Sequence, residues 1–354
     1  MENIRFKEGQ RAVELPVSDL LAQVTHSDGD IVVLCGTLVT GYGNANSDFD
    51  VHVFCDELPI VEPHHFDVND WISNDQGQWL DRATLQPGQR MKGLWNFWDD
   101  VKRAVDVKYW LVDEYQAYLQ TFRDRYDDAI QNLGYLRSSA YGLYGIGDNT
   151  ALAKIFEGRC ALGGDRFDAV NSILSKDQYC YLAYRYHLPT YDDFRDAAGA
   201  FVSEDYDNAV AFARKYAELT GWAFSHLLGN PNTNRKWVLE MVKRWPAPYD
   251  SLSARFVELY FRGLPDVEAR RRFVLDVVAL CDEILAASVP LQRQNPAFDF
   301  VDETRAFWAA KLGQDAEAGV RSEQLRLEYD WYARNFSDLA IPGGELIEMH
   351  RVEG

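Results

Sequence analysis

"VVLCGTLVTGYGNANSDFDVHVF", residues 32–54, decides both the fold and the candidate site of this chain. Two apolar runs flank a polar loop that begins with Gly36-Thr37 and ends with Asp48-Phe49-Asp50. Strand interiors disfavour aspartate, and two like charges on one face repel each other more strongly when they are buried. Something must offset this cost, and a bound metal ion is the first candidate.

The period of a strand brings the acids together. Residues i and i+2 share a face, so Asp48 and Asp50 point the same way, and His52 lies further along as a strand-end residue. Two carboxylates on a rigid strand supply the oxygen ligands that hard cations prefer. We expect Asp106, an acid in an otherwise apolar alternating run, to be the third ligand. Asp67, in "HHFDVND", is its rival.

The loop between the two apolar runs offers a seat for phosphate. Gly36 follows a strand directly, and a glycine there lets a phosphate approach the backbone closely. Thr37 adds a hydroxyl donor. A short helix beginning near Leu38 would turn its N-terminal amides toward the same anion. Lys108, on the face of the third acid, is expected either to touch a phosphate or to balance charge.

Composition bounds the class of protein. The chain has 354 residues, 47% of them apolar, which is enough for one large core or two ordinary ones. Its formal charge of −19 argues against sequence-independent binding to long nucleic acid and is compatible with a cationic small-molecule acceptor. The sequence shows neither a bilayer-spanning apolar run nor a signal-peptide core, so a cytoplasmic location without a membrane partner is the expectation. The five cysteines are dispersed without a CxxC and are expected to be reduced.

The first third of the chain mixes strand and helix signals. "IVVLC" (Ile31–Cys35) and "FDVHVFC" (Phe49–Cys55) read as buried strands, and "RAVDVKYWLVDEY" (103–115) contains another because it alternates well. Residues 64–71 are a candidate strand. Residues 93–100, "GLWNFWDD", are a candidate antiparallel partner with its two acids in the turn.

The character changes at Asp113, which we expect to cap a helix. Long helical patterns follow within residues 115–136, 203–228 and 266–288, with loops expected at 145–150, 157–167, 228–237 and 295–300. The prediction is an α+β fold. A small mixed sheet with flanking helices forms a catalytic domain over residues 1–113, and a larger all-α substrate or accessory domain follows over 114–354.

The pattern "GT", ten further residues, "DFDVHV" and a later "VDV" resembles the DNA polymerase beta-like nucleotidyltransferase superfamily. The resemblance covers roughly residues 31–113. In layout the chain looks most like the antibiotic nucleotidyltransferases of the aminoglycoside and lincosamide type, in which a "VEV"-type strand leads into "DE" and an apolar residue. "AVDVKYWLVDEYQAYL" has that form. Thr37 stands where the superfamily has serine, and its extra methyl group narrows the pocket.

The resemblance implies a small mixed nucleotidyltransferase sheet and metal-assisted nucleotidyl transfer. Asp48, Asp50 and Asp106 would be the catalytic acids and the ligands of Mg²⁺, with two ions expected. Gly36, Thr37, Ser47 and Lys108 would contact the NTP donor, for which ATP is the expectation. Asp106 or an acid of the helical domain would serve as the base.

The implied acceptor is a hydroxyl of a small antibiotic-like or natural-product molecule, and the chain would act as a monomer or a homodimer. Two alternatives stay open. One is nucleotidyl transfer to RNA or protein, and the other is a catalytically dead nucleotide-binding regulatory module.

Overall fold

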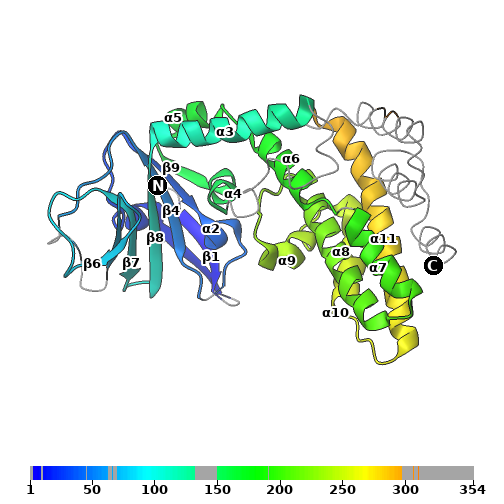
Figure 1. The fold of residues 1–354 in the computed structure, drawn as a ribbon. Coiled ribbons are helices and arrows are strands. Elements are labelled where there is room, and N and C mark those ends of the chain that lie inside the picture. The colour runs from blue at the N-terminus through cyan, green and yellow to red at the C-terminus, as the bar shows by residue number, and fades with distance from the viewer. Residues whose placement is uncertain are drawn as a thin grey trace. The chain divides into compact units, whose positions relative to one another are not determined.

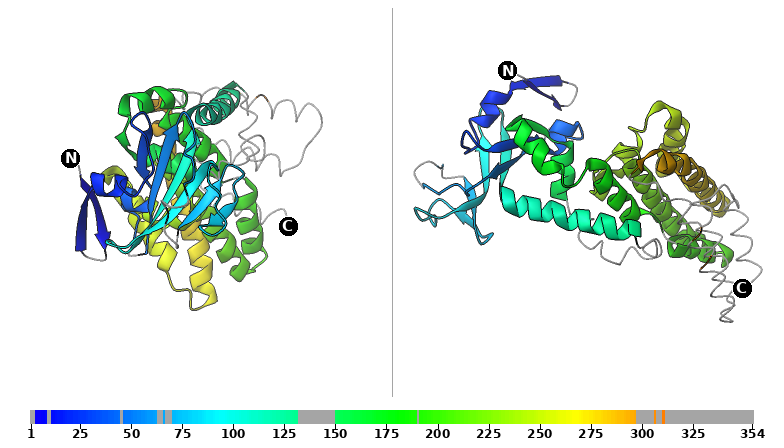
Figure 2. Two further views of the ribbon diagram at one scale, coloured as in Figure 1. Left: turned by 90° about the vertical axis from the view of Figure 1, so that its left-hand side faces the viewer. Right: turned by 90° about the horizontal axis from the view of Figure 1, so that it is seen from above.

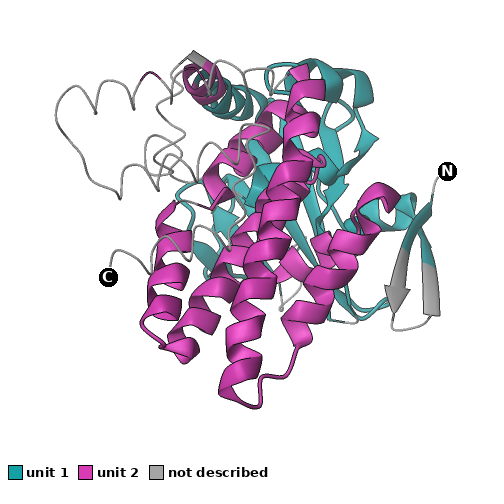
Figure 3. Ribbon diagram, turned by 90° about the vertical axis from the view of Figure 1, so that its right-hand side faces the viewer, with its two compact units in different colours: residues 1–124, 150–175 teal, residues 125–149, 176–354 magenta. Residues whose placement is uncertain are grey.

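A computed structural model describes residues 3–8, 11–44, 46–62, 66, 70–131, 150–189, 191–296, 306 and 310. The chain divides into two compact units (Figure 3). Unit 1 comprises residues 1–124 and 150–175, and unit 2 comprises residues 125–149 and 176–354. The expected boundary at 113/114 differs from this division. Residues 150–175 join unit 1 because they contribute an edge strand to its sheet and a helix on either side of that strand in the sequence.

Unit 1 is built on a seven-stranded mixed sheet (Figure 1). Its strands are β3 (Ile31–Cys35), β4 (Phe49–Cys55), β5 (Trp71–Asn74), β6 (Trp79–Asp81), β7 (Met91–Trp98), β8 (Arg103–Leu111) and β9 (Arg159–Leu162). Their order across the sheet is β6-β5-β7-β8-β4-β3-β9. β4 and β8 at the centre are parallel, and the other neighbours are antiparallel.

One face of this sheet is apolar and carries the core of unit 1. Alternating residues of the central strands are almost completely buried there: Val32, Leu34, Val51, Val53, Val105 and Val107. Two short helices, α1 (Val17–Leu21) and α2 (Gly36–Thr40), contribute Leu20 and Leu38 to the same core. The β-branched residues suit the pleated surface, and their burial stabilises the fold.

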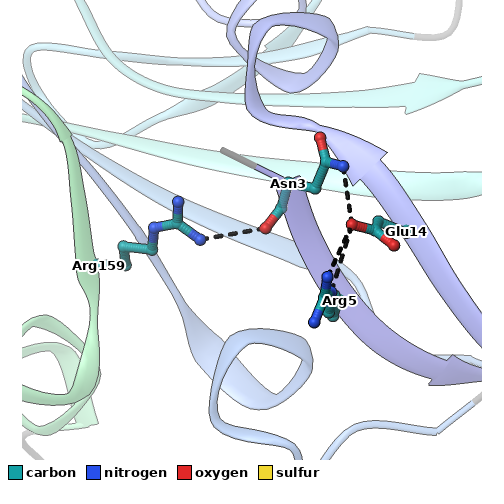
Figure 4. A network of polar contacts seen from close by, with 4 residues as sticks. All are labelled: Asn3, Arg5, Glu14 and Arg159. Atoms are coloured by element: carbon teal, nitrogen blue, oxygen red, sulfur yellow. Dashed lines mark hydrogen bonds and ion pairs between the residues drawn. The ribbon is translucent and has the colours of Figure 1, made fainter. Parts of the chain in front are cut away.

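A separate hairpin of β1 (Asn3–Glu8) and β2 (Arg11–Pro16) lies beside the sheet (Figure 2). A hydrogen bond ties it to the edge strand, and further polar contacts join its own two strands (Figure 4). Arg159 of β9 donates a 3.2 Å hydrogen bond to the Asn3 carbonyl, while Asn3 and Arg5 both donate to the Glu14 carboxylate. These pairs are largely exposed, so each stabilises the fold by at most about 1 kcal/mol. Ile4 of β1 is buried in the core, and Leu15 of β2 packs against it.

The second face of the sheet is polar near its centre and is flanked by later helices. α3 (Val112–Gln131) begins directly at the end of β8, so Asp113 lies in its first turn and not at the N-cap. In the first turn its negative charge interacts favourably with the helix dipole. α4 (Thr150–Glu157), β9 and α5 (Gly164–Asn171) follow. The expected loop at 157–167 is therefore wrong, because its "RCAL" segment pairs with β3 as an edge strand.

The described part of unit 2 is helical. Its helices are α6 (Lys176–His187), α7 (Tyr191–Val202), α8 (Tyr206–Leu227), α9 (Val238–Val242), α10 (Asp250–Phe261) and α11 (Val267–Gln294), with 3₁₀ turns at Arg235–Trp237 and Ala247–Tyr249. Buried aromatic rings fill its core, among them Tyr179, Tyr184, Phe194, Tyr216 and Phe224. His187 and His226 are buried among them, 3.0 Å apart through Nδ1 and Nε2.

The structure confirms the predicted α+β class with a helical C-terminal region. The partner of β8 predicted over 93–100 is confirmed as β7, with Asp99 and Asp100 in the turn. The candidate strand over 64–71 lies mostly outside the described residues; the strand that is seen, β5, begins at Trp71. Within the described residues, no helix combines the length and apolar composition that crossing a bilayer requires.

Candidate metal centre

Three carboxylates meet at the centre of the sheet, on its polar face. Asp50 lies on β4 directly opposite Asp106 on the parallel strand β8, and Asp48 is two residues upstream of Asp50. Ligand oxygens from the three side chains lie within 4.8 Å of one another. Asp50 is only 5% exposed, and the other two are half-buried. The structure therefore brings together the three acids predicted from the sequence.

Burial shapes the electrostatics of this cluster. Loss of solvent raises the pKa of Asp50; the charge of Lys154 opposes the rise, and the charges of Asp48 and Asp106 add to it. Burial also raises the pKa of Asp106, against the opposing charge of Lys108. Concentrated negative charge of this kind is costly, and a cation in the cluster would lower that cost.

Lys154 supplies a cation that the sequence reasoning missed. Its Nζ atom on α4 lies 2.6 Å from Oδ1 of Asp50, in a pair whose lysine is 30% and whose aspartate is 6% exposed. Burial alone would lower the pKa of Lys154, but the charge and hydrogen bond of Asp50 outweigh it and raise that pKa. The helix that carries Lys154 belongs to unit 1 and not to the helical unit that follows it. The sequence offers a lysine within a short apolar helix, but nothing in it identifies Asp50 as the partner.

The position of the Asp50 carboxylate requires a glycine at residue 36. It has a left-handed φ of +80°, and a Cβ atom placed on it would lie 1.9 Å from Oδ2 of Asp50. A side chain at this position would displace Asp50 from the cluster. The glycine was predicted to let a phosphate approach. In the structure it first of all lets Asp50 approach the turn after β3.

The loop that leads to Asp48 is held by a buried arginine. Arg103, 3% exposed, donates to the carbonyl oxygens of Ser47 at 2.9 Å and of Asn44 at 3.3 Å. The Ser47 hydroxyl accepts a 2.9 Å hydrogen bond from the Asn44 amide, so this predicted nucleotide contact has a structural role in the loop. Arg103 was not predicted, because an arginine at a strand start carries no signal of its contact with a distant loop.

The remaining predicted residues surround the cluster. Thr37 is half-buried in the first turn of α2, and its carbonyl accepts a 2.7 Å hydrogen bond from the Gly43 amide. Lys108 lies opposite His52 in the ladder of β4 and β8. His52 is buried rather than at a strand end; it accepts a 2.8 Å hydrogen bond from Trp110, and burial lowers its pKa to about 3. Asp67 falls outside the described residues.

These residues fit a hard divalent cation. Three carboxylates offer several oxygen ligands and leave room for water or phosphate, which is the donor set that Mg²⁺ or Ca²⁺ takes. The ammonium of Lys154 already neutralises one of the oxygens, which indicates that the cluster favours positive charge. The site can therefore hold a metal ion.

Scans against protein-family models, curated proteins and solved structures find no match for this chain. Its chemistry is therefore inferred from its own residues.

Proposed function

We propose that this chain is a Mg²⁺-dependent nucleotidyltransferase of the DNA polymerase beta-like kind, which moves a nucleoside monophosphate from an NTP to a hydroxyl of a small molecule. The observation that carries the proposal is the trio of carboxylates, two on neighbouring strands and Asp48 in the loop just before one of them, with the Gly36-Thr37 turn packed against Asp50. A sheet that only needed stability would not gather three acids at its centre.

Each residue has an expected task. Asp48, Asp50 and Asp106 would hold Mg²⁺, whose chemistry when bound is to neutralise charge on the triphosphate and on the departing pyrophosphate. The first turn of α2, with Thr37, would contact the triphosphate, and Lys154 and Lys108 would add positive charge beside it. Asp106 would accept the proton of the attacking hydroxyl, a contribution of roughly 10²–10⁴ to the rate.

ATP is the expected donor, and an antibiotic-like or natural-product hydroxyl compound is the expected acceptor. The net charge of −19 supports a neutral or cationic acceptor over RNA. Transfer to RNA or protein, and a catalytically dead nucleotide-binding module, are the alternatives.

Pyrophosphate release tests the proposal. Purified protein, Mg²⁺ and each of the four NTPs would be combined with a panel of hydroxylated acceptors. We expect one combination to release pyrophosphate, and we expect Asp48→Asn to abolish it. The matched control is Asp28→Asn, which changes an exposed acid of the same unit outside the cluster. Full activity in Asp48→Asn would refute the assignment.

Calorimetry separates the alternatives. Binding of an NTP that requires Mg²⁺ and is lost in Asp48→Asn supports a live site. Binding of the NTP without Mg²⁺ supports the nucleotide-binding regulatory module, and no binding of any NTP contradicts both the enzyme and that module. Salt-dependent binding of RNA would favour transfer to RNA.

A further inference from the structure

The polar face of the sheet continues beyond the carboxylates as a row of aromatic residues. Asp106 on β8 lies opposite Trp95 on β7, Trp95 lies opposite Trp71 on β5, and Trp71 lies opposite Asp81 on β6. Residues directly opposite one another in a ladder share a face. One line across four strands thus runs from a metal-ligand candidate, over two indole rings, to a second carboxylate.

The neighbouring row widens this surface. Lys108 lies opposite Gly93, Gly93 opposite Ser73, and Ser73 opposite Trp79. A Cβ atom placed on Gly93 would lie 3.3 Å from the Trp79 indole, so the ring lies over the backbone of β7 at a position without a side chain. Phe97 on β7 lies two residues beyond Trp95 and shares its face.

The rings are open to solvent. The exposed fraction is 47% for Trp71, 50% for Trp79 and 44% for Phe97, and Trp95 is half-buried. The alternate residues of the same strands, Ile72 and Leu94, are almost fully buried on the other face. Exposed aromatic residues gathered on one face indicate a binding surface, because a fold has no need to leave such area in water. We call Trp71, Trp79, Trp95 and Phe97 the aromatic platform.

The charges at the two ends of the first row favour a positively charged ligand. Carboxylates stand at both ends of it, Asp106 beside Trp95 and Asp81 beside Trp71. Indole faces attract cations through their quadrupole, and neighbouring carboxylates strengthen that attraction. Lys108 lies in the second row, and Lys154, the other lysine beside the carboxylates, is paired with Asp50. Neighbouring strands are about 4.8 Å apart, so a flat molecule of two or three rings on Trp95 and Trp71 would bring a substituent to Asp106.

We propose that the aromatic platform binds a small hydroxylated molecule whose flat aromatic ring system carries a positive charge, and that it presents the hydroxyl of this molecule at Asp106. The acceptor role rests on the proposed nucleotidyl transfer, whereas the binding itself does not.

The test measures binding of defined probes to the full chain by calorimetry. The main probe is N-methyl-6-hydroxyquinolinium, which is flat, hydroxylated and cationic. Its comparison is 2-naphthol, of the same size without charge. We expect the cation to bind about three- to thirtyfold more tightly than 2-naphthol. We expect the double variant Trp71→Ala/Trp79→Ala to weaken its binding about tenfold or more. Phe261→Ala is the matched control, because Phe261 is 67% exposed and belongs to unit 2.

Several results would overturn the proposal. One is equal binding of the two probes, and another is unchanged binding in the double variant when its urea unfolding matches that of the unsubstituted chain. If glucosamine binds to the chain and the quinolinium probe does not, the ligand is a sugar and not an aromatic cation. A single-stranded oligonucleotide whose binding needs Trp71 and Trp79 would replace the aromatic ligand class with nucleic acid.

Binding of Mg²⁺ and NTP to the same double variant separates the two proposals. Retained Mg²⁺-dependent NTP binding with lost quinolinium binding supports both. Quinolinium binding to a chain that binds no NTP overturns nucleotidyl transfer and keeps the platform as a ligand site.

Discussion

Gly36→Ala is the sharpest test of the candidate metal centre, because its cost can be separated into two parts. The first part is conformational: φ is +80°, a left-handed value that costs a residue with a side chain about 1–2 kcal/mol. The second is steric. The new Cβ would lie 1.9 Å from Oδ2 of Asp50, and ordinary contact begins at 3.4 Å, so the carboxylate must move by about 1.5 Å. Overpacking of this kind costs about 1–3 kcal/mol.

The chain contains a control for the first part. Gly77 has φ of +77°, and the structure describes no atom within 4 Å of a Cβ placed on it. Gly77→Ala therefore carries the conformational cost without the clash. In urea unfolding of the metal-free protein, we expect Gly36→Ala to lower the free energy of unfolding by about 1–3 kcal/mol more than Gly77→Ala.

The same variants report on metal binding. Ligands must keep their productive positions within about 0.5 Å, so a displaced Asp50 should weaken Mg²⁺ binding at least about tenfold. Calorimetry with Mg²⁺ and NTP should show this loss in Gly36→Ala and unchanged affinity in Gly77→Ala. Equal destabilisation of the two variants with equal Mg²⁺ affinity would refute the assigned contact between Gly36 and Asp50.

Two further predictions concern titratable groups that are largely buried. Lys154→Met should lower the free energy of unfolding of the metal-free protein by about 1–3 kcal/mol, because Asp50 loses its partner in a mostly buried site. Added Mg²⁺ should raise the urea midpoint of this variant more than that of the unsubstituted chain; an equal rise would contradict competition between Lys154 and the ion. Burial lowers the pKa of His226 to about 4 and that of His187 well below its usual range, so both stay neutral in the fold and bind protons when it unfolds. The free energy of unfolding should therefore fall as pH drops from about 6.5 toward 4, by up to about 1.4 kcal/mol per pH unit for each histidine; urea unfolding of His226→Gln should show a shallower dependence, and an unchanged slope would exclude this pair as the cause.

The central strands and the three acids could be predicted because their signals are local. Apolar runs and a period of two place Asp48, Asp50 and Asp106, and the parallel register of β4 with β8 then sets two of them side by side. Lys154 could not be found this way. It is separated from Asp50 by 104 residues of sequence, and no pattern within "TALAKIFE" specifies which strand the helix will cover.

The edge strand β9 was missed for a related reason. Its four residues, "RCAL", alternate too briefly to indicate a strand, and only pairing with β3 makes them one. The glycines of "GRCALGG" were misleading as well, because glycine-rich segments usually indicate a loop. In the structure Gly158 instead lets the chain pass close to β3 after α4, since a Cβ atom at this position would lie 2.6 Å from the Val33 side chain. Long-range contact, not local propensity, fixes this part of unit 1.

The division of the sheet into two faces explains how the fold can carry its charged cluster. On the apolar face, fully burying each Val or Leu stabilises the fold by roughly 1.5–3 kcal/mol, and six such residues from the central strands are buried there. Desolvating an ionised carboxylate costs several kcal/mol, and Lys154 offsets part of that cost at Asp50. Because alternate residues of a strand point to opposite faces, burying the acids costs free energy on the polar face but leaves the packing of the apolar core intact. A one-residue slip of β4 against β8 would turn its acids toward Val32 and Leu34, so the same apolar packing that stabilises the sheet also fixes the register on which the metal centre depends.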